Sequence, residues 1–427
     1  MKNHKEILEL LKKEVVLALG CTEPTAVALA AAYARKVLNA EPETIEICLS
    51  GNVLKNGMCV GIPGTKLVGL NIAATLGAMG GNPDAELEVL KDIKEEHIEK
   101  AKRFVEQGRT VIKEKQNSDK LYIEVICRKQ DHYSRVIIQG THTNIILIEA
   151  DGKNIFDRNT QSGVVVKNNE RFNGIKLSVE EIFEFATKVP FKEIEFILEC
   201  AEINMRLAKE GLKKSYGLQV GKTIKESIDK GIMGDDVINR AMLLAASASD
   251  ARMSGSCLPA MANSGSGNQG ITVMVPVFVY AEFLKVDKEK LARALILSNL
   301  ISIYIKTYLG RLAALCGAIT AAMGASTAIT YLLGGGLEQI NSSIKNMAGN
   351  ISGMFCDGAK PGCAMKVATC VNAAVQSATL AMNNRVVSGM EGIIADDVEK
   401  TIINLTKLGS EGLLEADKMI LNIMICK

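Results

Sequence analysis

Two cysteines stand out, because the residues between them favour a loop that turns back on itself. Cys356 and Cys363 lie in NISGMFCDGAKPGCAMKVATC, and the six residues between them include two Gly and one Pro. Such a loop can bring two thiolates to one centre. Pro361 suits the first turn of a helix, whose positive end favours a thiolate at Cys363, and Lys360 adds a positive charge. Two buried structural cysteines are the alternative. The spacing alone names no metal.

Cys21 lies at a second junction of this kind, in LALGCTEPTAVALAAAYA. Gly20 ends one predicted helix, and Pro24 fits the first turn of the next. A thiol at a helix N-terminus has a lowered pKa, so we expect Cys21 to ionise readily. A thiolate there can act as a nucleophile, a base or a metal ligand. A half-buried cysteine without a chemical role is the alternative.

The other eight cysteines carry weaker signals. Cys316 lies in an Ala-rich segment and reads locally as a small core residue, and Cys370, two helical turns after Cys363, is either core or a further ligand. Cys426 is the penultimate residue. The remaining five lie in apolar or mixed runs, and we predict that they are core residues: Cys48, Cys59, Cys127, Cys200 and Cys257.

Two Gly-rich polar segments could bind a small anion. SGNVLKNGMCVGIPGT (50–65) follows a predicted strand, and ANSGSGNQGI (262–271) precedes a predicted helix. Free backbone N–H groups in such loops suit a carboxylate. Neither segment matches a Walker A or a dinucleotide-binding pattern. His142, in GTHTN, is either a base, a substrate contact or a turn residue.

Composition limits what these residues can belong to. The chain has 427 residues, of which 48% are hydrophobic but only 4% aromatic, so its large core must be built by close approach of small residues. With 23% charged residues, global disorder is excluded. A net charge of +2 gives no basic surplus for nucleic acid or an anionic membrane. The eleven cysteines and the lack of an export signal favour a reducing, cytoplasmic location.

The elements that must position these residues show two patterns, one with many strands and one that is helical throughout. Residues 44–50 and several runs between 110 and 150 alternate as strands do, with helices expected near 66–79 and 84–107. After about residue 178 the periodicity is helical, and the uncharged run 313–333 reads as a buried helix because it is rich in Ala, Gly, Thr and Ser.

We therefore predict an α+β fold, in which a small mixed or antiparallel sheet lobe packs on a large all-helical lobe. Three segments make it up: 1–40, N-terminal helices that pack with the helical lobe; 41–177, the α+β lobe; and 178–427, the helical lobe that binds a cluster.

Taken together, the motifs resemble the L-cysteine desulfidase family, which is similar in its C-terminal half to the α-chain of iron–sulfur L-serine dehydratases. The resemblance runs in order from about residue 15 to 385. It rests on GCTEPTAVALA, SGNVLKNGMCVGIPGT, GTHTN, ANSGSGNQGI, GRLAALCGAITAAMGAS and ISGMFCDGAKPGCAMK. CDGAKPGC is shared with the dehydratases, whereas GCTEP and SGN-x-x-KN favour the desulfidase branch.

The resemblance implies a [4Fe–4S] cluster with one open iron, held by the cysteines that match Cys316, Cys356 and Cys363. It implies conversion of L-cysteine and water to pyruvate, ammonia and hydrogen sulfide without pyridoxal phosphate, with Cys21 as the base. Our candidates for contacts to the amino-acid substrate are Asn52, Lys55, His142, Asn263 and Lys360.

Alternatives remain open beside this interpretation. An iron–sulfur L-serine dehydratase is the nearest, and a non-enzymatic iron–sulfur sensor or a membrane transporter is further away. No nucleic-acid or membrane partner is expected, and a homodimer is allowed. In related dehydratases a C-terminal cysteine can occupy the open iron; here Lys427 follows Cys426, and a frayed tail is the alternative.

Overall fold

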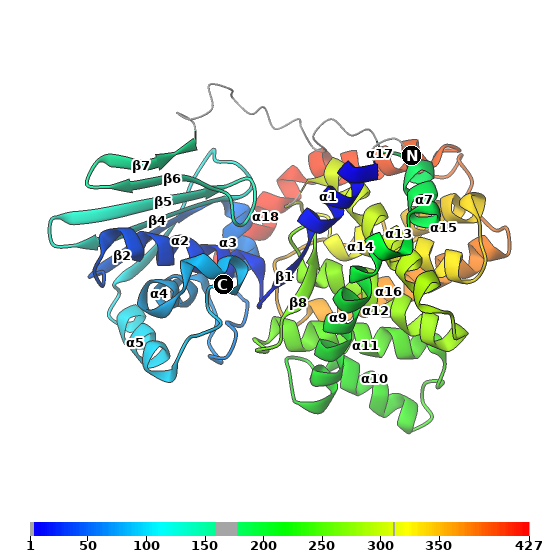
Figure 1. Cartoon of the computed structure of the whole chain (residues 1–427), viewed down its shortest axis with the longest axis horizontal. Coiled ribbons are helices and arrows are strands. Elements are labelled where there is room, and N and C mark those ends of the chain that lie inside the picture. Colours follow the sequence, from blue (N-terminus) through cyan, green and yellow to red (C-terminus); the bar gives the residue numbers. More distant parts are fainter. Residues whose placement is uncertain (1–3, 159–176, 311, 427) are drawn as a thin grey trace.

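Alternating β-branched residues build a six-stranded sheet in the first lobe of this computed structural model, which describes residues 4–158, 177–310 and 312–426 (Figure 1). The strand order is β3-β2-β4-β5-β6-β7. Neighbours are antiparallel except β2 and β3, which run parallel. The strands are β2 (Thr44–Leu49), β3 (Thr110–Glu114), β4 (Tyr122–Lys129), β5 (His132–Gln139), β6 (Ile145–Ala150) and β7 (Lys153–Asp157).

Small residues let helices approach this sheet closely. The lobe contains α2 (Thr22–Leu38), α3 (Gly51–Gly57), α4 (Leu70–Gly80), η1 (Pro83–Glu88) and α5 (Glu95–Glu106). A Cβ added at Gly77 of α4 would lie 2.2 Å from the carbonyl oxygen of Ala28 on α2, so the two helices meet backbone to backbone. The buried alanines of α2 share one apolar core with the inner face of the sheet.

Residues 51–57, expected as part of a Gly-rich loop, form helix α3 instead. Ser50 begins the helix, and its hydroxyl accepts a hydrogen bond from Val53 N at 3.4 Å. The serine N-cap stabilises the start of this helix. The glycines of the segment made a loop the expected structure.

The second lobe is helical, with α14 at its centre. α14 is almost wholly buried and packs against α12, α13, α15 and α16, as expected for the uncharged run 313–333. Its helices are α1 (His4–Glu14), α7 (Val179–Lys188), α8 (Phe191–Ile194), α9 (Phe196–Lys213), α10 (Val220–Asp229), α11 (Val237–Met253), α12 (Gly267–Leu284), α13 (Lys288–Leu309), α14 (Gly317–Leu332), α15 (Leu337–Asn350), α16 (Cys363–Met382) and α17 (Val398–Lys407). Among the described residues, no helix is both long and apolar enough to span a membrane. The predicted α+β fold is confirmed.

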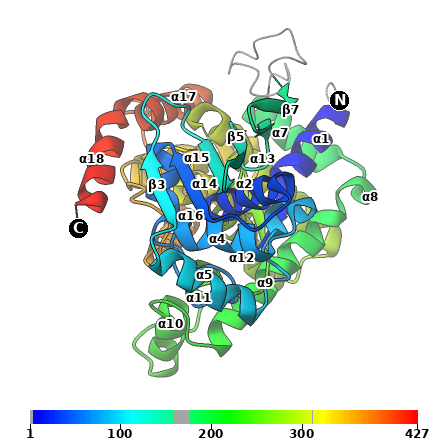
Figure 2. The ribbon, with the colours of Figure 1, turned by 90° about the vertical axis from the view of Figure 1, so that its left-hand side faces the viewer.

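Both ends of the chain depart from the expected division into segments. α1 packs in the helical lobe, and β1 (Val15–Ala18) pairs antiparallel with β8 (Ala260–Asn263). After Gly20, however, α2 packs on the sheet rather than on the helical lobe, because its alanines fit the sheet's inner face. The last helix, α18 (Leu414–Ile425), contacts α3 of the sheet lobe, and Figure 2 shows it at the edge of the molecule. The chain therefore crosses between the lobes at both ends.

Candidate active site

A small cavity of about 100 Å³ lies where the two lobes meet. The sheet lobe contributes the start of α2, the end of α3 and the turn between β5 and β6. The helical lobe contributes the N-terminal ends of α12, α14 and α16. Four helix N-termini, including that of α2, therefore line one cavity, and their positive ends favour negative charge inside it.

Three cysteines from the helical lobe line this cavity together: Cys316, Cys356 and Cys363. A short antiparallel bridge between Leu315 and Phe355 brings the first two side by side. In this bridge Cys316 N donates to Met354 O at 2.9 Å, and Cys356 N donates to Ala314 O at 2.6 Å.

Cys363 joins them because the loop after Cys356 turns back, as its glycines and proline predict. Cys363 is the first residue of α16, and its Sγ lies 3.7 Å from the carbonyl oxygen of Gly358. Gly358 has φ of +87°, a left-handed conformation that favours glycine.

Burial dominates the ionisation of these thiols. It raises the pKa of Cys316 to about 12, with a further contribution from Cys356, and it raises the pKa of Cys363. The expected lowering at the α16 N-terminus is therefore wrong for the protein without a ligand, because loss of hydration outweighs the helix end and Lys360. Iron would displace the thiol protons on binding.

The donor set fits an iron–sulfur cluster. Three cysteines are soft ligands, which select zinc, copper(I) or iron–sulfur centres. Among the described residues, no three His, Cys, Asp or Glu side chains are grouped to hold a single metal ion. A [4Fe–4S] cluster binds its thiolates through different irons, so its ligands do not meet at one atom. Cys316, Cys356 and Cys363 around one cavity fit such a cluster better than one ion.

Cys21 reaches the same cavity from the sheet lobe. It is the N-cap of α2, is 1% exposed, and lies with its Sγ 3.7 Å from Met253 Sδ. It forms a small apolar cluster with Val60 and Met253, against which Cys363 packs. Burial raises the pKa of Cys21 to about 12, although Arg252 acts in the opposite direction. The expected low pKa is therefore wrong for this state as well.

A buried carboxylate lies beside Cys21. Glu23 Oε1 accepts a hydrogen bond from Asn56 Nδ2 at 3.1 Å and lies 3.9 Å from His142 Nε2. Glu23 Oε2 accepts from Thr22 Oγ1 at 3.1 Å. Burial acts to raise the pKa of Glu23, but its contacts with His142 and Asn56 outweigh that effect and lower the pKa to about 2. Glu23 therefore carries a negative charge in the cavity wall.

Three polar atoms of the cavity-lining residues are buried and have no hydrogen-bond partner among the described residues: Asn56 Oδ1, His142 Nε2 and Arg252 Nε. Such atoms are rare in folded proteins and call for an explanation such as a ligand. One is an acceptor, one a donor, and the imidazole nitrogen is either. Together with Glu23, they suit a small molecule that carries both charges.

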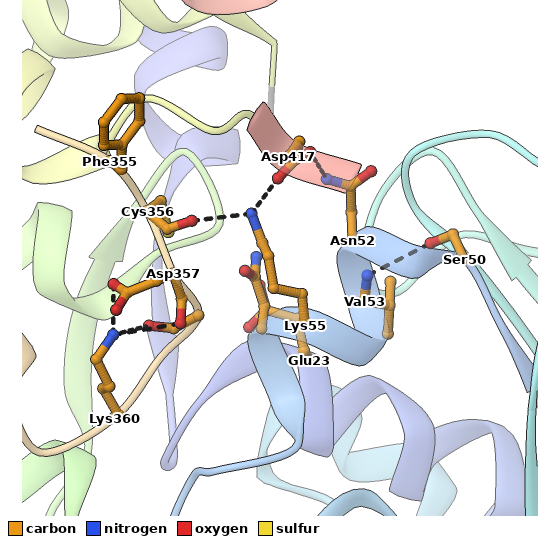
Figure 3. A network of polar contacts seen from close by, with 12 residues as sticks. Glu23, Ser50, Asn52, Val53, Lys55, Phe355, Cys356, Asp357, Lys360 and Asp417 are labelled. Carbon is orange, nitrogen blue, oxygen red and sulfur yellow. Dashed lines mark hydrogen bonds and ion pairs between the residues drawn. The ribbon is translucent and has the colours of Figure 1, made fainter. Parts of the chain in front are cut away.

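Of the five predicted substrate contacts, His142 lines the cavity. In the part of the chain that the structure describes, the other four do not, because their side chains are bound elsewhere. Asn52 and Lys55 bind Asp417 of α18, as Figure 3 shows. Asn263 is buried and donates to Asn299 Oδ1 at 2.9 Å. Lys360 donates to Asp357 O at 3.2 Å.

Sequence reasoning missed Glu23, Asn56 and Arg252. Glu23 stands two residues after Cys21 in GCTEP, and Asn56 lies in the segment whose other Asn and Lys were chosen. Arg252 had the clearest signal, since it is a charged residue near the end of a run of small residues, SASASDARMSGS.

The remaining cysteines divide differently from the prediction. Cys127, Cys200 and Cys370 are buried, as expected of core residues. Cys59 and Cys257 are exposed, so the prediction of core positions is wrong for them, because both lie in surface loops; Cys48 is half-buried. Cys426 is exposed at the end of α18, and its role as a ligand stays a prediction.

Comparison with known proteins gives the family. The serine dehydratase alpha chain family matches residues 84–422. A UPF0597 protein of Oleidesulfovibrio alaskensis is 50% identical over 420 residues, which cover 98% of this chain and 97% of that protein. UPF0597 proteins of Aeromonas hydrophila and Parabacteroides distasonis are each 49% identical, over 99% of this chain and 96% and 98% of theirs. The chain belongs to the serine dehydratase alpha chain family, and the resemblance to iron–sulfur serine dehydratases is confirmed.

Proposed function

We propose that the protein is an L-cysteine desulfidase, a lyase that converts L-cysteine and water to pyruvate, ammonia and hydrogen sulfide. Membership of the serine dehydratase alpha chain family supports an iron–sulfur lyase that does not use pyridoxal phosphate. One observation carries the proposal: three cysteines of one lobe and Cys21 of the other line a single small cavity.

Cys316, Cys356 and Cys363 would hold the [4Fe–4S] cluster. Three protein ligands would leave one iron open, and the bound cluster would then supply a Lewis acid for the leaving group of the substrate. Lys366, which also lines the cavity, donates to Phe355 O and to Asp357 and so places a positive charge near these ligands. This charge and the four helix ends offset the negative charge of the thiolates.

Polar groups of the cavity wall would bind the two charged groups of the amino acid. In this proposal Arg252 and the N-terminus of α12 bind the substrate carboxylate, as a guanidinium and backbone N–H groups suit an anion. The carboxylate of Glu23 and the side-chain oxygen Oδ1 of Asn56 accept hydrogen bonds from the ammonium group of the substrate. Fixing both ends of a small substrate orients its Cα–H bond, and such positioning supplies a large part of catalysis.

Cys21 would take the α-proton. The Cα–H electron pair then forms the Cα–Cβ double bond, and the Cβ–S bond breaks with its electron pair leaving on sulfur. The products are hydrosulfide and 2-aminoacrylate, which tautomerises to an imine. Water adds to the imine, and pyruvate and ammonia result. To act as the base Cys21 must first lose its own proton, and Arg252 is the charge that favours this.

L-serine dehydratase is the second candidate, and the description of the matched family favours it. The same elimination would expel hydroxide instead of hydrosulfide. The two activities differ in the leaving atom at Cβ, and the GCTEP and SGN-x-x-KN segments, which resemble those of cysteine desulfidases, favour the substrate that carries sulfur.

Anaerobic reconstitution with iron and sulfide, followed by assays of both substrates, tests the proposal. We expect sulfide and pyruvate in equal amounts from L-cysteine, and loss of this activity in Cys21→Ala with the iron content unchanged. Cys200→Ala, which removes a buried cysteine outside the cavity lining, is the matched control. Pyruvate from L-serine without sulfide from L-cysteine would establish the dehydratase instead. Loss of iron in Cys21→Ala would make Cys21 a ligand.

A further inference from the structure

Three lysines hold the main chain on either side of Cys356. Lys366 donates to Phe355 O at 2.6 Å, Lys55 to Cys356 O at 3.0 Å and Lys360 to Asp357 O at 3.2 Å. Three successive carbonyl groups thus each receive an ammonium group. A cluster ligand must present its thiolate in a fixed direction. The three hydrogen bonds constrain the backbone of residues 355–357, which carries the proposed ligand Cys356.

The three lysines differ in the source of their counterion. Lys360 and Lys366 both pair with Asp357, which belongs to the same segment. Lys55 comes from α3 and pairs with Asp417 of α18, more than 360 residues away in sequence. Figure 3 shows Lys55 between the carboxylate of Asp417 and the carbonyl of Cys356. The hydrogen bond from Lys55 to the carbonyl of Cys356 therefore depends on a carboxylate of the distant helix α18.

Lys55 requires this carboxylate. Its side chain is 1% exposed, and that of Asp417 is 15% exposed. A buried ammonium group without a counterion is strongly unfavourable, so Lys55 would turn away from the loop if Asp417 lost its charge. Asn52 donates to the second oxygen of Asp417 and fixes the carboxylate between α3 and α18.

The backbone around this ion pair is close-packed. A Cβ added at Gly358 would lie 2.3 Å from Lys55 O and 3.3 Å from Met424 Cε of α18. Leu421 of the same helix would contact a Cβ at Gly51, and it is buried. The outer face of α18 is exposed, with Met419 63% and Ile423 55% accessible. α18 therefore contacts this region through Asp417, Leu421 and Met424.

We propose that Asp417 is a positioning residue of the cluster site, which acts through Lys55 to fix the carbonyl of Cys356 and thereby the direction of its thiolate. That Cys356 is a cluster ligand rests on the proposed function. The C-terminal helix is then part of the site, although Asp417 lies outside the cavity lining.

Asp417→Asn in the full chain tests this proposal, with Asp417→Glu as the conservative variant. Glu415→Gln is the matched control, because Glu415 lies on the same helix, is 84% exposed and pairs with Lys418. Two measurements are made: the rate of alkylation of each cysteine in cluster-free protein, resolved by mass spectrometry, and the electron paramagnetic resonance spectrum of the reduced cluster after reconstitution.

In Asp417→Asn we expect alkylation of Cys356 to be at least tenfold faster, with Cys200 unchanged and the spectrum altered. In Asp417→Glu the alkylation rate of Cys356 and the spectrum should both return toward those of wild type. In Glu415→Gln both should equal those of wild type. Alkylation of Cys356 within twofold of wild type, together with an unchanged spectrum, would overturn the proposal.

If Asp417→Asn does not fold by circular dichroism, the double variant Lys55→Met, Asp417→Leu replaces the ion pair by apolar groups. It should show the same rise in Cys356 alkylation, and an unchanged rate overturns the proposal. A wild-type protein that binds a cluster but releases neither sulfide nor pyruvate would contradict the proposed function alone, since the alkylation rates do not depend on turnover.

Discussion

At the scale of single residues, Glu23 is a buried carboxylate that keeps its negative charge. Its side chain is only 10% exposed in the cavity wall, and its low pKa means that it stays ionised across the pH range of ordinary assays. Because its folded pKa lies below the unfolded value, its contribution to stability is present above about pH 4.5 and is lost as the pH falls toward 2. A permanent charge here suits the binding of an ammonium group.

Glu23→Gln is therefore expected to weaken catalysis without removing the cluster. A charged hydrogen bond contributes about 1.5–3 kcal/mol, so kcat/KM for L-cysteine should fall roughly 10- to 150-fold. Steady-state kinetics and iron analysis on the same preparation check this. Glu46→Gln, which removes a carboxylate paired with Lys113 in the same lobe, should leave kcat/KM within twofold. Full activity in Glu23→Gln would contradict a substrate contact.

The cluster ligands and the cavity were not equally predictable from sequence. Local composition identified the loop from Cys356 to Cys363 because Gly and Pro determine a turn directly. Cys316 had no local signal and came from the family resemblance, since its place beside Cys356 depends on a bridge between segments 40 residues apart. The polar side chains of Lys55 and Asn52 in a Gly-rich segment predict substrate contacts. Their pairing with Asp417 is a long-range contact that no local pattern encodes.

At the scale of elements, glycines mark where helices touch. A Cβ at Gly324 of α14 would lie 2.2 Å from Ser298 O of α13, and one at Gly211 of α9 would lie 2.0 Å from Ser247 O of α11. The prediction of a core built by small residues is confirmed at these contacts. The strands between residues 110 and 150 and the buried helix within 313–333 were predicted correctly. The helix expected near 84–107 is divided into η1 and α5, and α3 was not predicted, since it is short and Gly-rich.

Gly77→Ala should separate α4 from α2. The added methyl group meets the backbone of Ala28, which cannot move aside as a side chain does. Overpacking of this kind costs about 1–3 kcal/mol. Urea denaturation should show a lower free energy of unfolding by that amount. Gly353→Ala is the control, because a Cβ there meets nothing within 4 Å, and it should change the free energy by less than about 0.5 kcal/mol. Equal stability of the two variants would argue against the close contact.

Asp250 of α11 accepts a hydrogen bond at the start of α10, and because this carboxyl group is buried, its ionisation makes stability depend on pH. Asp250 Oδ2 accepts from Gly221 N at 3.0 Å, and burial raises the pKa of Asp250 to about 6. Since the folded pKa exceeds the ordinary value of 3.8, the stability that comes from burying a neutral carboxyl group is fully present below pH 3.8 and is lost as the pH rises through about 6.

Asp250→Asn removes this titration. It should gain on the order of 1 kcal/mol in stability relative to wild type between pH 5 and pH 8. Urea denaturation at both pH values measures the difference. Asp235→Asn, at an exposed ion pair with Arg240, should show no comparable change between the two pH values. The same pH dependence in wild type and Asp250→Asn would contradict the assignment.

At the scale of the whole molecule, the proposed base and the proposed ligands belong to different lobes. Cys21 lies at the start of a helix packed on the sheet, whereas Cys316, Cys356 and Cys363 belong to the helical lobe. The lobes are joined by the chain that passes from β1 to α2 and by α18 contacting α3. This arrangement was beyond prediction from sequence, because α2 and α18 have the periodicity of ordinary helices and nothing local states on which lobe they pack.

The difference between a ligand and a base should appear in the stability of the whole chain. A cluster that binds the folded protein alone stabilises it by about 3–4 kcal/mol when the iron and sulfide that form it are at 100–1,000 times the dissociation constant. In a chain of 427 residues that raises the melting temperature by about 4 °C. Differential scanning calorimetry, done anaerobically on cluster-loaded and cluster-free protein, measures the rise. It should persist in Cys21→Ala and disappear in Cys316→Ala, while Cys426→Ala should match wild type if the tail holds no iron. A rise that vanishes in Cys21→Ala would move that residue from base to ligand and would place the cluster across both lobes.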